Sequence, residues 1–118
     1  MRSFKFNVHG GATIDVDHNS ITISVAGVKG WLFQRIKPRT KTIPFDQIVR
    51  FDYKQASVTV GYLRIITPDY EEYPSSLYVA EHDPQAFIFP KEDTIVFNEL
   101  MRELQKMCPN IKRQQLKM

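Results

Sequence analysis

A basic and aromatic segment between residues 29 and 41 shows the clearest potential for binding chemistry. Five lysines and arginines stand in it, and no acidic residue occurs between positions 18 and 45. Bases around exposed aromatic rings bind anionic phosphates while the rings insert into a membrane surface or stack on nucleobases. The candidate ligand- or partner-binding residues are Lys29, Trp31, Arg35, Lys37, Arg39 and Lys41.

The same segment has a purely structural interpretation. A long hairpin would place the Trp31 and Phe33 rings in the core and leave the bases solvated. A second charged stretch has the opposite sign, and we interpret it as a solvated loop. Head-to-tail self-association between the two stretches stays open as a route to a homo-oligomer. The acidic residues are Asp69, Glu71, Glu72, Glu81 and Asp83.

No group of residues has the spacing of a catalytic or metal site. The sequence Asp17-His18-Asn19 is typical of a turn, and His9 precedes Gly10-Gly11. Neither matches the ligand spacing of a zinc or calcium site. His82 has acidic neighbours but no accompanying nucleophile or oxyanion-hole loop. We therefore expect no enzyme activity, no cofactor and no bound metal.

Composition favours one small domain of the cytoplasm. The 118 residues include 42% hydrophobic and 25% charged side chains, with a net charge of +3. The single cysteine, Cys108, excludes an intrachain disulfide, which fits a reducing compartment. No apolar run is long enough for a membrane span, and the N-terminus does not resemble a secretory signal.

The first two thirds of the chain contain short runs of alternating polar and apolar residues. Such runs predict antiparallel strands with one wet face. Residues 58–67 are apolar on both faces, which indicates a central strand, and Gly61 within it suggests a bend or bulge. The runs lie at residues 3–8, 12–17, 21–25, 42–45, 48–53, 58–67, 77–80 and 87–89.

Residues 93–107 change to a helical period. Phe97, Leu100, Met101, Leu104 and Met107 share one face, and Pro109 ends the segment. This stripe predicts a C-terminal helix packed on the core. We therefore expect a domain over residues 1–108, mostly β with one α-helix, and a flexible basic tail over residues 109–118.

The layout resembles a bacterial and phage PH-like family of unknown function that is often fused to a short C-terminal oligomerisation domain. Four stretches carry the resemblance in order: 12–15 (Ala-Thr-Ile-Asp), 41–48 (Lys-Thr-Ile-Pro-Phe-Asp-Gln-Ile), 61–65 (Gly-Tyr-Leu-Arg-Ile) and 83–89 (Asp-Pro-Gln-Ala-Phe-Ile-Phe). The sequence departs from the family where Gly10-Gly11 replaces an Asn-Gly, and it lacks the oligomerisation module.

The resemblance implies a PH-like barrel or roll of about seven antiparallel strands capped by the helix, and neither an activity nor a settled ligand. The leading expectation is a non-enzymatic module that binds a protein or peptide, prophage-encoded and acting on a host protein. The first alternative is binding to anionic lipid through residues 29–41. Nucleic-acid binding through the same bases ranks third, because five bases make a modest electrostatic footprint.

Overall fold

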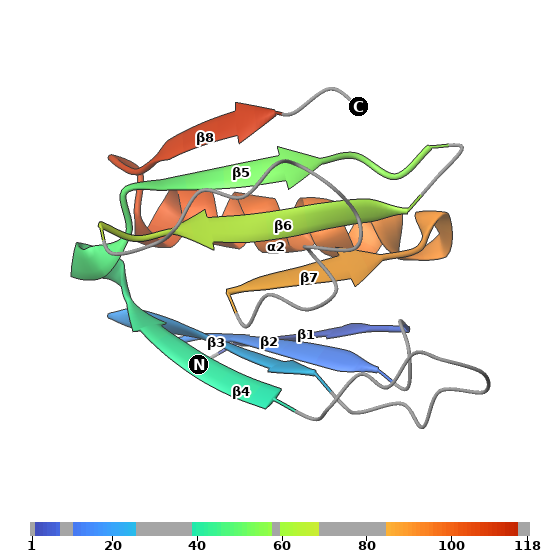
Figure 1. The fold of residues 1–118 in the computed structure, drawn as a ribbon, viewed down its shortest axis with the longest axis horizontal. Helices are drawn as coiled ribbons and strands as arrows, with labels where there is room; N and C mark the ends of the chain where they lie inside the picture. The colour runs from blue at the N-terminus through green and yellow to red at the C-terminus, as the bar shows by residue number, and fades with distance from the viewer. Residues whose placement is uncertain (1, 8–10, 26–38, 58–59, 69–84, 116–118) are drawn as a thin grey trace.

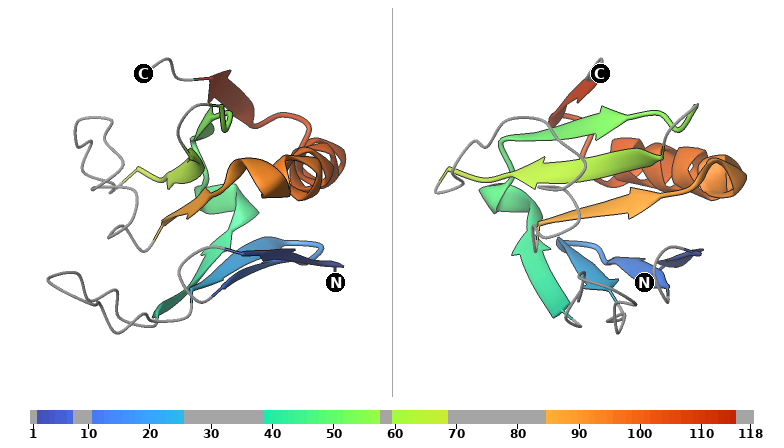
Figure 2. Two further views of the ribbon diagram at one scale, coloured as in Figure 1. Left: turned by 90° about the vertical axis from the view of Figure 1, so that its right-hand side faces the viewer. Right: turned by 45° about the vertical axis from the view of Figure 1, so that its right-hand side comes forward.

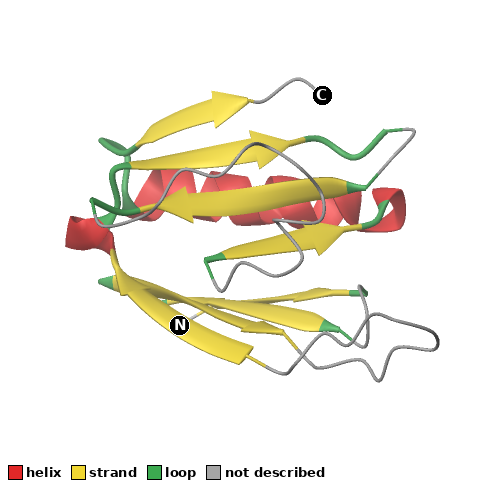
Figure 3. Cartoon of the chain, viewed as in Figure 1, coloured by secondary structure: helices red, strands yellow, loops and turns green. Residues whose placement is uncertain are grey.

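The computed structural model of this protein describes residues 2–7, 11–25, 39–57, 60–68 and 85–115. Their strands form two four-stranded sheets, and a long helix packs beside the second sheet (Figures 1 and 3). The predicted class, mostly β with one C-terminal α-helix, is confirmed. The predicted strand at residues 77–80 lies outside the described residues.

The first sheet is an antiparallel meander whose strands follow one another in the chain. Alternate residues such as Phe4, Ile14 and Ile23 are buried, as the period-2 pattern predicts. Its strands are β1 (Arg2–Phe6), β2 (Ala12–Val16), β3 (Ser20–Val25) and β4 (Arg39–Pro44).

A short 3-10 helix, η1 (Phe45–Gln47), carries the chain from β4 into the second sheet. Three strands there are antiparallel neighbours: β5 (Arg50–Lys54), β6 (Gly61–Ile66) and β7 (Ala86–Phe89). A fourth strand, β8 (Lys112–Gln115), lies parallel to β5 and gives the order β7-β6-β5-β8. The structure thus describes eight strands, where about seven were expected, and β8 was not among the predicted runs.

The helix α2 (Thr94–Met107) follows a 3-10 turn, η2 (Lys91–Asp93), and it is seen end-on in the left view of Figure 2. The predicted stripe is confirmed, because Phe97, Leu100, Met101 and Leu104 are buried and Met107 packs against the core. Glu103, which the period places on the polar face, is buried as well, and Arg2 Nη1 lies 3.5 Å from its Oε2.

Aromatic rings connect the two sheets with the helix. The Phe6 ring of β1 lies 4.9 Å from Phe87 of β7, measured between centroids. Phe89 on the same strand stacks on Phe97 of α2 at 4.2 Å, and Phe97 is also 6.0 Å from Tyr53 of β5. The helix therefore belongs to the same core as both sheets.

Asp93 joins the start of α2 to the end of β1. Its Oδ2 accepts the Asn7 backbone N–H at 2.6 Å, and its Oδ1 accepts the Asn7 side-chain amide at 3.3 Å. The carboxylate is buried and makes no capping hydrogen bond to its own helix. Asp93 therefore fixes the helix against the first sheet.

Candidate functional site

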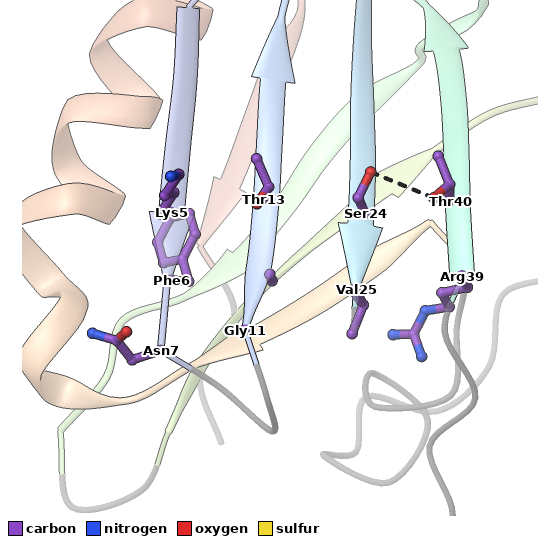
Figure 4. Close-up of a pocket in the computed structure, with 10 residues that line it drawn as sticks. Lys5, Phe6, Asn7, Gly11, Thr13, Ser24, Val25, Arg39 and Thr40 are labelled. Carbon is purple, nitrogen blue, oxygen red and sulfur yellow. Dashed lines mark hydrogen bonds between the residues drawn. The ribbon is translucent and has the colours of Figure 1, made fainter. Parts of the chain in front are cut away.

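A cavity of about 570 Å³ lies at one end of the first sheet, with side chains from all four strands around it (Figure 4). Lys5, Thr13, Ser24 and Thr40 form one row across the sheet, each paired in register with the next. Two bases and three hydroxyls make this lining suitable for an anionic ligand. The lining residues are Lys5, Phe6, Asn7, Gly11, Ala12, Thr13, Ser24, Val25, Arg39 and Thr40.

Arg39 is the basic residue of this cavity that the sequence analysis singled out. It stands at the start of β4, half-buried, and its Nη2 donates to the Ala86 carbonyl oxygen at 3.3 Å. The bond links the first sheet to β7, so Arg39 also has a structural role. Lys5 was not predicted, because a single lysine at a wet strand position gives no sequence signal.

Lys41 is exposed on β4 and lines a smaller cavity of about 150 Å³. The structure therefore places Arg39 and Lys41 on one strand but at two different cavities. The remaining candidates, Lys29, Trp31, Arg35 and Lys37, lie outside the described residues, as does the acidic stretch at 69–83.

The turn at Asp17 and His18 carries an exposed acid–base pair. Asp17 Oδ1 accepts the His18 backbone N–H at 2.8 Å and lies 3.0 Å from His18 Nδ1. The backbone hydrogen bond, followed by the side-chain contact, lowers the pKa of Asp17 from its usual value. Within the described ranges, no group of three or more His, Cys, Asp or Glu side chains could hold a metal ion.

Cys108 follows directly after α2. Its thiol is buried, and Sγ donates to the Leu104 carbonyl oxygen at 2.9 Å. Burial raises the pKa of this thiol to about 11, and the nearby Arg113 charge opposes that rise. The protonated form predominates at neutral pH, so Cys108 is a poor nucleophile.

The strand β5 has one charged face and one apolar face. Arg50, Asp52 and Lys54 share the charged face, where Asp52 accepts hydrogen bonds from Arg50 Nε at 2.9 Å and Arg50 Nη2 at 3.3 Å. Phe51 and Tyr53 share the other face, and Tyr53 contacts the helix ring Phe97.

Asp52 is the central acid of the charged face. It is 1% exposed, and Arg64 Nη2 of the adjacent strand β6 lies 3.4 Å from its Oδ2. Lys54, also buried, donates from Nζ to the carbonyl oxygens of Gln55 and Val60, both at 3.2 Å. Hydrogen bonds and ion pairs compensate these groups for the loss of water.

β8 pairs with β5 through its backbone. The register places Lys112 beside Arg50, Arg113 beside Phe51 and Gln115 beside Tyr53. All four β8 residues are exposed, and none of their side chains makes a hydrogen bond or ion pair in the part of the chain that the structure describes. The interactions that the structure gives for this strand are its main-chain pairing with β5 and the charge of Arg113 close to Cys108.

Main-chain pairing of this kind is energetically close to neutral. A protein hydrogen bond contributes a net of roughly 0.5–1.5 kcal/mol, while ordering a residue costs roughly 1–2 kcal/mol. Because Ile111 packs against the core just before β8, the strand starts next to its partner without a long loop to close. The gain from pairing β8 with β5 is therefore of the same size as the cost of ordering it.

No helix in the described part of the chain combines the length and the apolar character needed to cross a bilayer. Comparison of the chain with protein-family models, curated proteins and solved structures found no match. The assignment of a function therefore rests on the geometry of the two sheets and their edges.

Proposed function

We propose that this chain is a non-enzymatic, PH-like interaction domain of the cytoplasm that binds an extended segment of a protein partner by strand addition. The observation that carries the proposal is β8, a strand without buried side chains that nevertheless pairs with β5. At such an edge the main-chain hydrogen bonds give affinity for extended backbone, and the flanking side chains give specificity.

The order of elements supports the PH-like part of the proposal. A four-stranded antiparallel meander is followed by three further antiparallel strands and then by the helix that fills the core. The family resemblance adds the expectation of a prophage-encoded chain whose partner is a host protein.

A variant that cannot form β8 tests strand addition at β5. We choose the full-length Arg113→Pro/Gln114→Pro variant because neighbouring strand residues direct their N–H groups to opposite sides, so one of the two prolines removes a donor facing β5. A random decapeptide library is selected on this variant. Selected peptides should bind it and shift the NMR amide signals of residues 50–54.

The matched control is Arg113→Ala/Gln114→Ala, which removes the same side chains but keeps both N–H groups. It should bind the selected peptides more weakly than the proline variant, because β8 still occupies the edge. If a folded proline variant selects no peptide, or its peptides shift signals elsewhere, strand addition at β5 is wrong.

A second candidate function is binding of anionic lipid at the cavity of the first sheet. Lys5 lines it from β1, in one row with the hydroxyl residues Thr13, Ser24 and Thr40. Arg39 lines it from the start of β4 but belongs to the neighbouring row, with Val25. A phosphate group would find Lys5 and several hydroxyl donors on one face, with the Arg39 cation lining the same cavity.

Cosedimentation with phosphatidylserine vesicles at low salt tests this candidate. Lys5→Glu should abolish sedimentation, whereas Lys106→Glu, the same charge change at an exposed position of α2, should largely preserve it. If the wild-type chain does not sediment, lipid binding is excluded. A single-stranded oligonucleotide in place of the vesicles tests nucleic-acid binding.

A further inference from the structure

β8 is poorly matched to the strand that it covers. The apolar Phe51 and Tyr53 side chains of β5 have the polar side chains of Arg113 and Gln115 as their register partners. Side chains that are paired in register point to the same face of a sheet, so these two β8 residues lie on the face that α2 covers.

The surroundings of that face are apolar. Just before β8 in the chain, Met107 and Ile111 are partly buried against the core, and Cys108 between them is buried. Arg113 lies near the end of α2, close enough for its charge to oppose the burial-driven rise in the pKa of Cys108. An apolar side chain at position 113 or 115 would cover this surface better than the exposed polar ones do.

The opposite face is mismatched in charge. Lys112 is paired with Arg50, and like charges directly opposite each other destabilise a sheet. Gln114 is paired with Asp52, whose carboxylate is already occupied by Arg50 and Arg64. An acidic residue in the place of Lys112 would remove this like-charge pair and stand opposite Arg50, which also binds Asp52.

We infer that β8 is a weak internal occupant of the β5 edge and that the partner is a strand parallel to β5 with two apolar side chains facing α2 and an acidic one beside Arg50. This inference rests on the proposed function. It adds which side chains the partner strand carries and how β8 regulates access to the β5 edge. The tail protects the edge from indiscriminate pairing, and a segment of the stated pattern displaces it.

Two single substitutions in the full-length chain test whether an apolar side chain on β8 strengthens its pairing with β5 only when it points to the face that α2 covers. Gln115→Val and Gln114→Val make the same chemical change at neighbouring positions that point to opposite faces. Amide hydrogen exchange of residues 50–54 is compared with that of the wild type. Gln115→Val should slow exchange of the amides paired with β8 by about threefold or more, because a partly buried valine stabilises the pairing.

Gln114→Val should leave exchange within about twofold of the wild type, since it faces the charged side of β5. Equal protection in the two variants, or greater protection in Gln114→Val, would overturn the inference. Lys112→Glu should also slow the exchange of the amides at residues 50–54. Lys112→Gln, which removes the positive charge without adding a negative one, should slow it less.

The peptides selected on the proline variant provide a second readout. They should carry apolar residues at alternate positions, and Gln115→Val should reduce their affinity for the chain because its own tail competes better. Peptides that bind at β5 without this pattern would refute the inference and leave strand addition intact. Selection of no peptide, with slower exchange in Gln115→Val, would instead refute strand addition by a partner.

Discussion

Gly61 shows how closely single atoms pack where β6 begins. An added Cβ would lie 2.5 Å from the Lys54 carbonyl oxygen and 2.5 Å from Phe89 Cζ. The sequence suggested a bend or bulge at this glycine, and the structure gives a different reason for it: the backbone of the preceding strand and a buried ring leave no room for a side chain.

We expect Gly61→Ala to lower the free energy of unfolding by about 1–3 kcal/mol or more, because the ring and the β5 backbone must both move. Urea denaturation followed by circular dichroism measures this change. Ser57→Ala, at an exposed position nearby, should leave the midpoint nearly unchanged. An unchanged midpoint for Gly61→Ala would show that the close contact does not exist in solution.

Cys108 should be protected from thiol reagents while the chain is folded. Its pKa is raised by burial from 9.0 to about 11, so at pH 8.5 the native thiolate fraction is lower than in urea by a factor of about 75. The reaction rate with an aromatic disulfide reagent, with and without urea, checks this. Comparable rates in both conditions would contradict the burial.

The same titration affects stability. The pKa of the Cys108 thiol is higher in the folded state than in the unfolded state. The contribution of this thiol to the free energy of unfolding is therefore complete below pH 9 and is lost as the pH rises through 11. The stability advantage of the wild type over Cys108→Ala should therefore shrink between pH 9 and pH 11, as measured by urea denaturation. An advantage that stays constant over that interval would contradict the raised pKa.

Among the elements, α2 and the strands of the first sheet were the most predictable. Five apolar residues at helical spacing defined the buried face of α2, and strict alternation defined β2 and β3. These patterns arise because one face of each element meets the core. Asp93 could not be predicted in the same way, since a carboxylate before a helix usually indicates a cap.

The tether between Asp93 and Asn7 should contribute measurably to stability. Asp93→Ala leaves the Asn7 backbone N–H without its acceptor, so we expect a loss of about 1–3 kcal/mol in the free energy of unfolding. Asp93→Asn keeps one oxygen acceptor and should lose less. Urea denaturation of both variants distinguishes them, and equal losses would mean that the hydrogen bonds are not the cause.

β8 was unpredictable because its sequence has no periodic pattern. Lys112-Arg113-Gln114-Gln115 contains no apolar residue, and the end of α2 determines which strand it reaches. Only one of the two bases that line the cavity was predicted. Arg39 belongs to the basic segment of residues 29–41, whereas the contribution of Lys5 depends on how the four strands of the first sheet align. Pairing between distant segments does not follow from local composition.

At the scale of the whole molecule, the two candidate surfaces belong to different sheets. The cavity lined by Lys5 and Arg39 is built from β1–β4, and the edge for strand addition is formed by β5 (Figure 1). Substitutions at Lys5 and in β8 should therefore act independently, because the two positions lie in different sheets.

The fold should survive without its last strand. Among the described residues, a chain ending at residue 111 loses no buried side chain, since all four residues of β8 are exposed. We expect its thermal midpoint to fall by less than about 8 °C, which corresponds to about 1 kcal/mol in a domain of this size. Loss of cooperative unfolding in this variant would show that β8 is an integral part of the second sheet.

The basic residues of β8 also make the strand a natural protease target. Trypsin cleaves after lysine and arginine, and Lys112 and Arg113 stand side by side in a segment whose backbone is protected only while it pairs with β5. Limited digestion should thus speed up when a bound ligand ejects the tail, and the size of the fragment would reveal the event without any label.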